Sequence, residues 1–195
     1  MKDIKKEKVL IVDVECSCWM GKPPEGMRQE IIEIGISMLN TISNEVSEKR
    51  SFLIRPTDSK VGWFCKKLTS IDQKMLDTDG IDLKEACEIL KNEYDSKNIA
   101  WCSWGKFDRE QFEKDCIHKN VDYPFSPLFF NGQSMFQKIS ILDGPMSVKK
   151  GLEHMEAIFE GKQHRAVNDA YNTARLLSLA LKKADKNFFN AFSIN

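Results

Sequence analysis

Three stretches in the first third of the chain have the polarity patterns of β-strands. Residues 8–16 contain a run of four apolar side chains, and residues 29–40 place apolar side chains at every second position from 32 to 38. Residues 47–56 form a third such stretch, which ends at Pro56. An apolar period of two is typical of a strand with one buried face. Three successive strands predict that the sheet begins antiparallel.

Helical periodicity dominates the rest of the chain. Helices are predicted over 82–94, 108–120, 147–159 and 167–184, and a short helix capped by Thr69 or Ser70 is predicted to end at Leu76. Strands are predicted over 98–105 and 128–132. Strands first, followed by alternation with helices, predict an α/β fold: a mixed sheet flanked by helices.

Length and composition favour one compact domain over residues 1–195, with its core at about 8–182. Lys plus Arg and Asp plus Glu number 29 each, so the chain has no global basic field for long nucleic acid. The six cysteines include no C-x-x-C pair, which argues against a structural zinc site and favours reduced thiols. No apolar run approaches the roughly 18 residues of a membrane span, and the charged start lacks a signal peptide's apolar region. We predict a cytoplasmic protein with no membrane association.

Two acids interrupt the first apolar strand. Side chains two residues apart on a strand point to the same side, so Asp13 and Glu15 share a face. Carboxylates buried without partners cost several kcal/mol each or take up protons. Backbone amides or a lysine are one means of satisfying them, and a metal ion is another.

Two further acids and a histidine are candidates for the same site. Asp108 follows a predicted inner strand, and ligands of α/β sheets gather at such strand ends. Asp169 lies early in the last long helix, five residues after His164, which we place on the entry loop. Each has an alternative role: Asp108 as a helix N-cap, Asp169 as a complement to the helix dipole, and His164 as a surface residue.

Four carboxylates match the charge of two divalent cations. Mg²⁺ and Mn²⁺ prefer carboxylate oxygens, and two such ions about 3.5–4 Å apart stabilise the attacking and leaving oxygens of a phosphoryl displacement. We therefore predict a site for two such ions that attracts a phosphate. His164, with a reference pKa near 6.5, is suited to accept a proton from the attacking water.

These motifs occur in a recognisable order. The segments are "DVE" with "CSCW", "QEIIEIG", "FCKKLTSIDQ", "WGKFD" and "HRAVNDAYNTARLL". In this order they resemble the DEDDh 3′-to-5′ exonucleases, most closely the branch of the 3′ histone-mRNA exonuclease, the enhanced-RNAi exonucleases and bacterial KapD-like proteins. The resemblance extends from about residue 8 to 182.

The resemblance implies an RNase H-like fold, with a five-stranded mixed sheet and helices on both faces. It also implies hydrolysis of single-stranded RNA or DNA 3′ ends to nucleoside 5′-monophosphates, with two Mg²⁺ or Mn²⁺ ions. By carry-over Asp13 bridges both metals, Glu15 and Asp169 complete the first metal's shell, and Asp108 holds the second. His164 is the general base. No obligate protein partner is implied.

Substrate contacts are also expected by resemblance. They are Cys16, Ser17, Cys18 and Trp19 after the D-x-E motif, and Leu68 and Thr69 in the "LT" stretch. Core packing or anchoring of the loop is an equal alternative for Trp19. The chain departs from the family pattern at Asn168, where an Asp is common, and at Lys106, where this branch often has an acid.

Several other residues invite a functional interpretation but have a simpler one. Packing in the core is favoured over base stacking for four aromatic residues: Trp63, Phe64, Trp101 and Trp104. Lys66 and Lys67 are expected to be exposed charges, and His118 and His154 to be structural or solvated. Two alternative functions also remain open: a nucleic-acid-binding protein without turnover, and a proofreading subunit bound to a polymerase.

Overall fold

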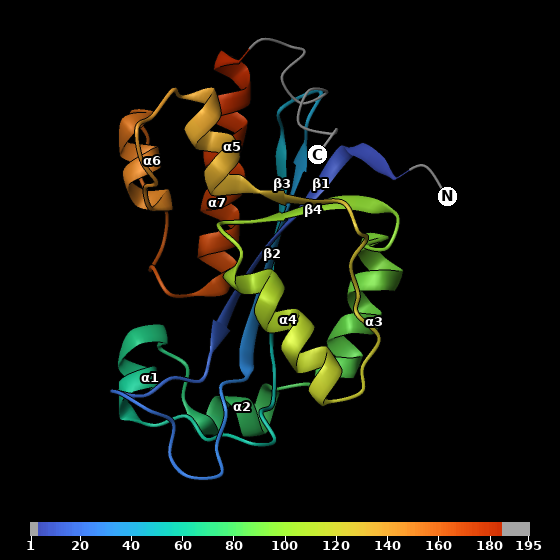
Figure 1. Ribbon diagram of the computed structural model, residues 1–195, viewed down its shortest axis with the longest axis vertical. Coiled ribbons are helices and arrows are strands. Elements are labelled where there is room, and N and C mark those ends of the chain that lie inside the picture. The colour runs from blue at the N-terminus through green and yellow to red at the C-terminus, as the bar shows by residue number, and fades with distance from the viewer. Residues whose placement is uncertain (1–3, 185–195) are drawn as a thin grey trace.

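The structure is a computed structural model that describes residues 4–184 (Figure 1). The predicted domain of 1–195 thus includes two short ends that lie outside the described residues. The strands are β1 (Lys5–Cys16), β2 (Ile31–Asn40), β3 (Val46–Leu53), β4 (Ile99–Ser103) and β5 (Phe129–Asn131). The helices are α1 (Trp63–Thr69), α2 (Gln73–Asp79), α3 (Leu83–Tyr94), α4 (Phe107–His118), α5 (Gly132–Ile139), α6 (Val148–His154) and α7 (Ala166–Lys183).

The strands form one mixed sheet in the order β3-β2-β1-β4-β5. β2 pairs antiparallel with both β1 and β3, whereas β4 pairs parallel with β1 and β5. The predicted five-stranded mixed sheet with an antiparallel start is confirmed. Because β1 and β4 are parallel neighbours, their carboxyl ends lie at the same edge of the sheet.

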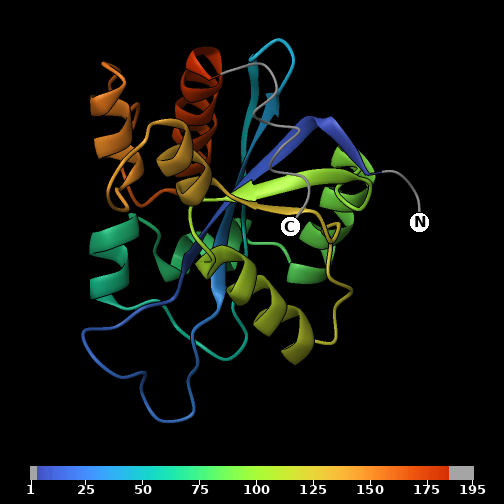
Figure 2. The ribbon, with the colours of Figure 1, turned by 45° about the horizontal axis from the view of Figure 1, so that its top comes forward.

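Helices cover both faces of the sheet, as predicted (Figures 1 and 2). Leu10, Val12 and Val14 of β1 pack with residues of α3 and α4. Val9 and Ile11 point to the other face and pack with residues of α5, α6 and α7. Strand alternation therefore places Asp13, two residues beyond Ile11, on the α7 side of the sheet.

The predicted cap of the short second helix is wrong. Ser70 ends α1 in a left-handed conformation with φ 65°, and its N–H donates to the carbonyl of Lys66. Asp72 begins α2 instead, because its side chain accepts a hydrogen bond from the N–H of Met75. The stretch thus forms two short helices, and α1 precedes the single predicted one.

Two other helices differ from their predicted spans. α5 was not predicted; it begins where the side chain of Asn131 accepts a hydrogen bond from the N–H of Ser134, 3.1 Å away. α6 ends at His154 rather than near 159, because the N–H groups of the following residues turn back onto carbonyls of its last turn. Among residues 4–184, no helix is both long and hydrophobic enough to cross a membrane.

The tryptophans divide between core and surface. Trp101 is 1% exposed, and its ring stacks on that of Phe125 with centroids 4.1 Å apart. Trp63 at the start of α1 is 66% exposed, so its predicted core position is wrong. Trp63 lies in the first turn of a short helix, where its side chain is left outside the packed layers.

The two tryptophans are expected to contribute differently to the free energy of unfolding. Replacing Trp101 with alanine is expected to destabilise the protein by about 3–5 kcal/mol, because it removes a large buried ring and leaves a cavity. Trp63→Ala is the matched control and is expected to stay within about 0.5 kcal/mol of the parent protein. Urea denaturation followed by circular dichroism measures both values. Similar losses for the two variants would contradict the assigned core.

Candidate metal centre and active site

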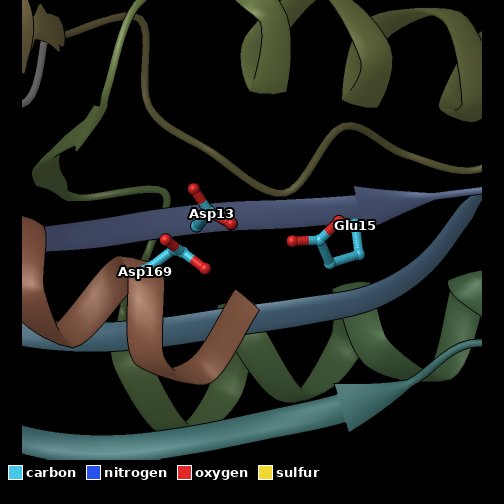
Figure 3. A group of neighbouring side chains, drawn as sticks. All are labelled: Asp13, Glu15 and Asp169. Carbon is cyan, nitrogen blue, oxygen red and sulfur yellow. The ribbon is translucent and has the colours of Figure 1, made fainter. Parts of the chain in front are cut away.

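Three carboxylates from two distant elements meet on the α7 side of the sheet. Asp13 and Glu15 lie on β1, and Asp169 projects toward them from the first turns of α7 (Figure 3). Each offers one oxygen atom, and these atoms all lie within 4.8 Å of one another. The structure thus brings together three of the four predicted acids, although the chain separates Asp13 from Asp169 by more than 150 residues.

A glycine allows α7 to come this close. Gly35 of β2 pairs with Asp13 in the sheet register. A Cβ atom at Gly35 would lie only 2.0 Å from the carbonyl carbon and oxygen of Ala166, and 2.4 Å from the nitrogen of Val167. The first turn of α7 therefore rests directly on the backbone of β2. This contact places Asp169, three residues after Ala166, beside Asp13.

Asp108 approaches the site from the opposite side of β1. It is 5% exposed, and its Oδ1 accepts a hydrogen bond from the N–H of Val14, 2.9 Å away. After burial, the negative charge of Asp108 is the largest cause of the raised pKa of Asp13. The N-cap of α4 is Lys106, so the alternative role of Asp108 as the helix cap is wrong. Asp108 lies outside the three-carboxylate group but within its electrostatic reach.

Burial and neighbouring negative charges raise the pKa values of all four acids. Burial, and then the negative charges of Asp108 and Asp169, raise the pKa of Asp13 well above its usual value. Burial and the charge of Asp169 raise the pKa of Glu15 to about 8. The pKa values of Asp108 and Asp169 rise to about 6, with burial again the main cause.

Part of each shift comes from a neighbouring carboxylate, so the cluster has excess negative charge when its acids are ionised. A cluster of carboxylate oxygens with this excess charge fits hard divalent cations such as Mg²⁺ and Mn²⁺. The donor set contains no thiolate or imidazole, which would favour zinc. All six cysteines are free thiols.

His164 lies on the loop that enters α7, as predicted. Its side chain is exposed, and its φ of 59° is in the left-handed region. Its positive charge, when present, lowers the pKa of Asp169, which places the imidazole near the acid cluster. An exposed imidazole beside half-buried acids is accessible to both a water molecule and a substrate.

The side chains of α7 hold this loop. Asn168 donates through Nδ2 to the carbonyl of Lys162, 3.0 Å away, and Asn172 both donates to and accepts from the backbone of Glu160. The family's common Asp at position 168 has no N–H to donate when ionised. The departure at Asn168 thus adds a donor to the loop, whereas Lys106, the other departure, has an exposed side chain.

The predicted substrate residues differ in accessibility. Ser17 is fully buried, and its hydroxyl accepts a hydrogen bond from the N–H of Glu30. Thr69 is also fully buried and donates to the carbonyl of Cys65. Cys16 is buried as well, whereas Cys18, Trp19 and Leu68 are half-buried. Only the last three have side chains partly available to a nucleotide, and the roles of all six remain predictions.

Three basic residues with possible functional roles have ordinary surface environments. The Nε2 of His118 lies 2.8 Å from Asp58, and Lys66 pairs with Asp72 at 3.0 Å. His154 is exposed near the ring of Phe136.

Sequence reasoning missed Glu33. This acid lies in the quoted "QEIIEIG" segment, is fully buried on β2, and pairs with Glu15 in the register. Its charge raises the pKa values of Asp13, Glu15 and Asp169. The signal was its position within a strand of buried apolar residues.

Comparison with known proteins identifies the family that has this arrangement. The model of the exonuclease family, RNase_T, matches residues 10–177, which is most of the chain. The chain belongs to the exonuclease family. The 3′-5′ exonuclease Snipper of Drosophila melanogaster is 28% identical over 193 residues, covering 87% of this chain and 67% of the fly protein. The 3′-5′ exoribonuclease 1 of Rattus norvegicus is 28% identical over 179 residues, covering 86% of this chain and 51% of the rat protein.

A solved structure has the same fold. The nuclease domain of 3′hExo, described as a DEDDh family member bound to rAMP, superposes with a TM-score of 0.77 at 24% identity. The match covers 91% of this chain and 92% of that one. The predicted exonuclease family and the predicted fold are confirmed. The chain spans only about half the length of the rat relative.

The raised pKa values predict a metal-dependent stability that changes with pH. An acid whose folded pKa is raised stabilises the fold when protonated; that contribution is complete below the unfolded pKa and is lost as pH rises through the folded pKa. For Glu15 this window runs from 4.5 to about 8, and for Asp108 and Asp169 from 3.8 to about 6. The metal-free exonuclease domain is therefore expected to lose stability across this range.

Mn²⁺ competes with these protons, so its stabilising effect is expected to be larger at about pH 8.5 than at about pH 5.5. Thermal unfolding with Mn²⁺ or with EDTA at each pH measures the difference. Asp13→Asn is expected to remove most of the Mn²⁺-dependent increase in Tm, whereas the exposed Asp79→Asn leaves it in place. An increase that is independent of pH would contradict the assigned centre.

Proposed function

We propose that this exonuclease domain is a metal-dependent 3′-to-5′ exonuclease that hydrolyses single-stranded RNA or DNA ends to nucleoside 5′-monophosphates. The convergence of Asp13, Glu15 and Asp169 within 4.8 Å of one another carries the proposal. The chain belongs to the exonuclease family, and the two relatives named above are a 3′-5′ exonuclease and a 3′-5′ exoribonuclease. The complete acid set argues against a binding protein without turnover.

Four acids would hold two divalent ions in this proposal. Asp13 would contact both, Glu15 and Asp169 would complete the shell of one, and Asp108 would hold the other. When bound, Mg²⁺ or Mn²⁺ supplies positive charge that stabilises a displacement at phosphorus. Repulsion between the carboxylates contributes to the raised pKa values of Asp13 and Glu15. The same repulsion favours the binding of cations, because a bound cation removes it.

His164 would accept the proton of the attacking water at its imidazole. A general base must lie within reach of the attacking water, and histidine is the side chain most often used in this role. Its loop position exposes the ring to solvent while Asp169 lies beside it. Cys18, Trp19 and Leu68 would contact the terminal nucleotide, since their side chains are partly accessible.

The substrate is a short or unstructured end. A formal net charge of zero does not support strong, sequence-independent binding of long duplexes. The name of the rat relative makes RNA a substrate to test first. We also propose a cytoplasmic location, which suits six free thiols, and no obligate protein partner. A polymerase-bound proofreading subunit would have the same chemistry but would copurify with a polymerase.

A degradation assay tests the proposed activity with 5′-labelled single-stranded RNA and DNA oligonucleotides in the presence of Mg²⁺, Mn²⁺ or EDTA. We expect a ladder that shortens from the 3′ end, release of mononucleotides, and no reaction in EDTA. Asp13→Ala is expected to lower the rate of degradation by orders of magnitude. His164→Ala is expected to lower it about 10²–10⁴-fold, which is the usual contribution of a general base.

Two matched variants control this assay. His154→Ala and Asp79→Ala remove an exposed histidine and an exposed acid that have no part in the proposed site, and both are expected to retain parental rates. Circular dichroism confirms that each variant is folded. Parental rates in folded Asp13→Ala and His164→Ala variants would overturn the proposed function.

A further inference from the structure

An ion pair connects β2 to the start of α7 beside the acid cluster. Oε1 of Glu33 lies 2.8 Å from Nη2 of Arg165, and its Oε2 accepts a hydrogen bond from Nε of the same guanidinium at 3.1 Å. The N–H of Ala166 donates to Oε2 at 2.9 Å. The Glu33 carboxylate thus accepts three hydrogen bonds from two consecutive residues while being completely buried. We call these two side chains the Glu33–Arg165 pair.

The Glu33–Arg165 pair lies at the candidate metal centre. Glu33 is directly opposite Glu15 in the antiparallel register, and directly opposite residues point to the same face of a sheet. Its charge contributes to the raised pKa values of the three clustered acids. Glu33 is therefore a fifth carboxylate beside a centre that four acids already form.

The charges of this region balance only when Arg165 is included. Five carboxylates carry five negative charges, and one guanidinium leaves four, which equals the charge of two divalent cations. The guanidinium engages Glu33 in a bidentate geometry, which orients it toward that acid. Arg165 also lowers the pKa of Glu15, so its charge reaches a proposed metal ligand.

The same pair restrains the backbone on both sides of the reaction site. Arg165 directly follows His164 and directly precedes α7. Its N–H donates to Oδ2 of Asp169 at 3.1 Å, while its side chain is held on β2 by Glu33. No side chain caps α7 at Arg165, and the Glu33 carboxylate instead accepts the first helical N–H. One residue thus connects the histidine, the helix start and the acid of α7.

We propose that Glu33 and Arg165 are positioning residues of the exonuclease site, an inference that depends on the proposed function. Arg165 cancels the charge of Glu33, so the centre presents four net negative charges. The pair also holds the backbone that presents His164. Neither residue contacts the reacting atoms in this proposal.

Metal binding distinguishes this role from a purely structural one. Mn²⁺ titration of the full chain by calorimetry is expected to show about tenfold tighter binding for Arg165→Gln, because the Glu33 charge is uncovered. Glu33→Gln is expected to bind about tenfold more weakly, because the guanidinium is left unpaired beside the centre. A pair that only supports the fold would shift both variants in the same direction or shift neither, and that result overturns the proposal.

Kinetics then separate charge from positioning. Arg165→Lys retains the charge but loses the planar two-point contact. We expect the Mn²⁺ affinity of Arg165→Lys to lie within about twofold of that of the parent protein, since the charge is present. We expect its kcat to be at least about tenfold below the parental value, with KM unchanged, because the backbone that presents His164 is less firmly held. Parental kcat in Arg165→Lys would overturn the positioning role.

Two controls complete the experiment. Arg50→Gln breaks an exposed ion pair with Glu93, on another part of the sheet, and is expected to change neither Mn²⁺ affinity nor kcat. If Arg165→Gln does not fold, Arg165→Met takes its place, because it also removes the charge and is expected to show the same tighter Mn²⁺ binding. A parent protein that binds no Mn²⁺ and releases no mononucleotides defeats the proposed function itself; a parent that does both, with variants that shift together, defeats only the Glu33–Arg165 proposal.

Discussion

The direct contact between the first turn of α7 and the backbone of β2 determines the rest of this site. It exists because Gly35 has no side chain: a Cβ atom there would overlap the carbonyl of Ala166. Close-packed interiors do not absorb an overlap of this size without moving an element. With α7 seated at this depth, Asp169 reaches the face of β1 that carries Asp13, and the loop with His164 lies at the same end of the sheet.

The resulting site trades stability for binding capacity. Three acids gathered within 4.8 Å, with a fourth close behind β1, repel one another and lose hydration, which is why their pKa values rise. Such a cluster costs folding free energy in the absence of cations. Arg165 offsets the charge of the buried Glu33 beside this cluster. In the proposed function, an overall neutral chain would attract a phosphodiester locally, through divalent ions bound by these acids.

Local sequence patterns correctly predicted the longer strands and helices, whose apolar period repeats several times. The structure contains β1 where a strand was predicted at 8–16, and it contains α3 and α7 where helices were predicted at 82–94 and 167–184. Short helices were harder, because one or two turns carry little periodicity and depend on their caps. Ser70 and Asp72 are both good capping residues, and only the backbone geometry shows that the first ends a helix while the second begins one.

The sequence by itself determined the sheet-and-helix order, the shared face of Asp13 and Glu15, and the loop position of His164, because these follow from local periodicity and spacing. Motif order further indicated the family. Only the tertiary structure decided that Glu33 is a fifth acid paired with Arg165, that Ser17 and Thr69 are fully buried, and that Trp63 is exposed. Those features depend on strand register and on the depth at which one helix packs against a sheet, and both are set by contacts between residues far apart in the chain.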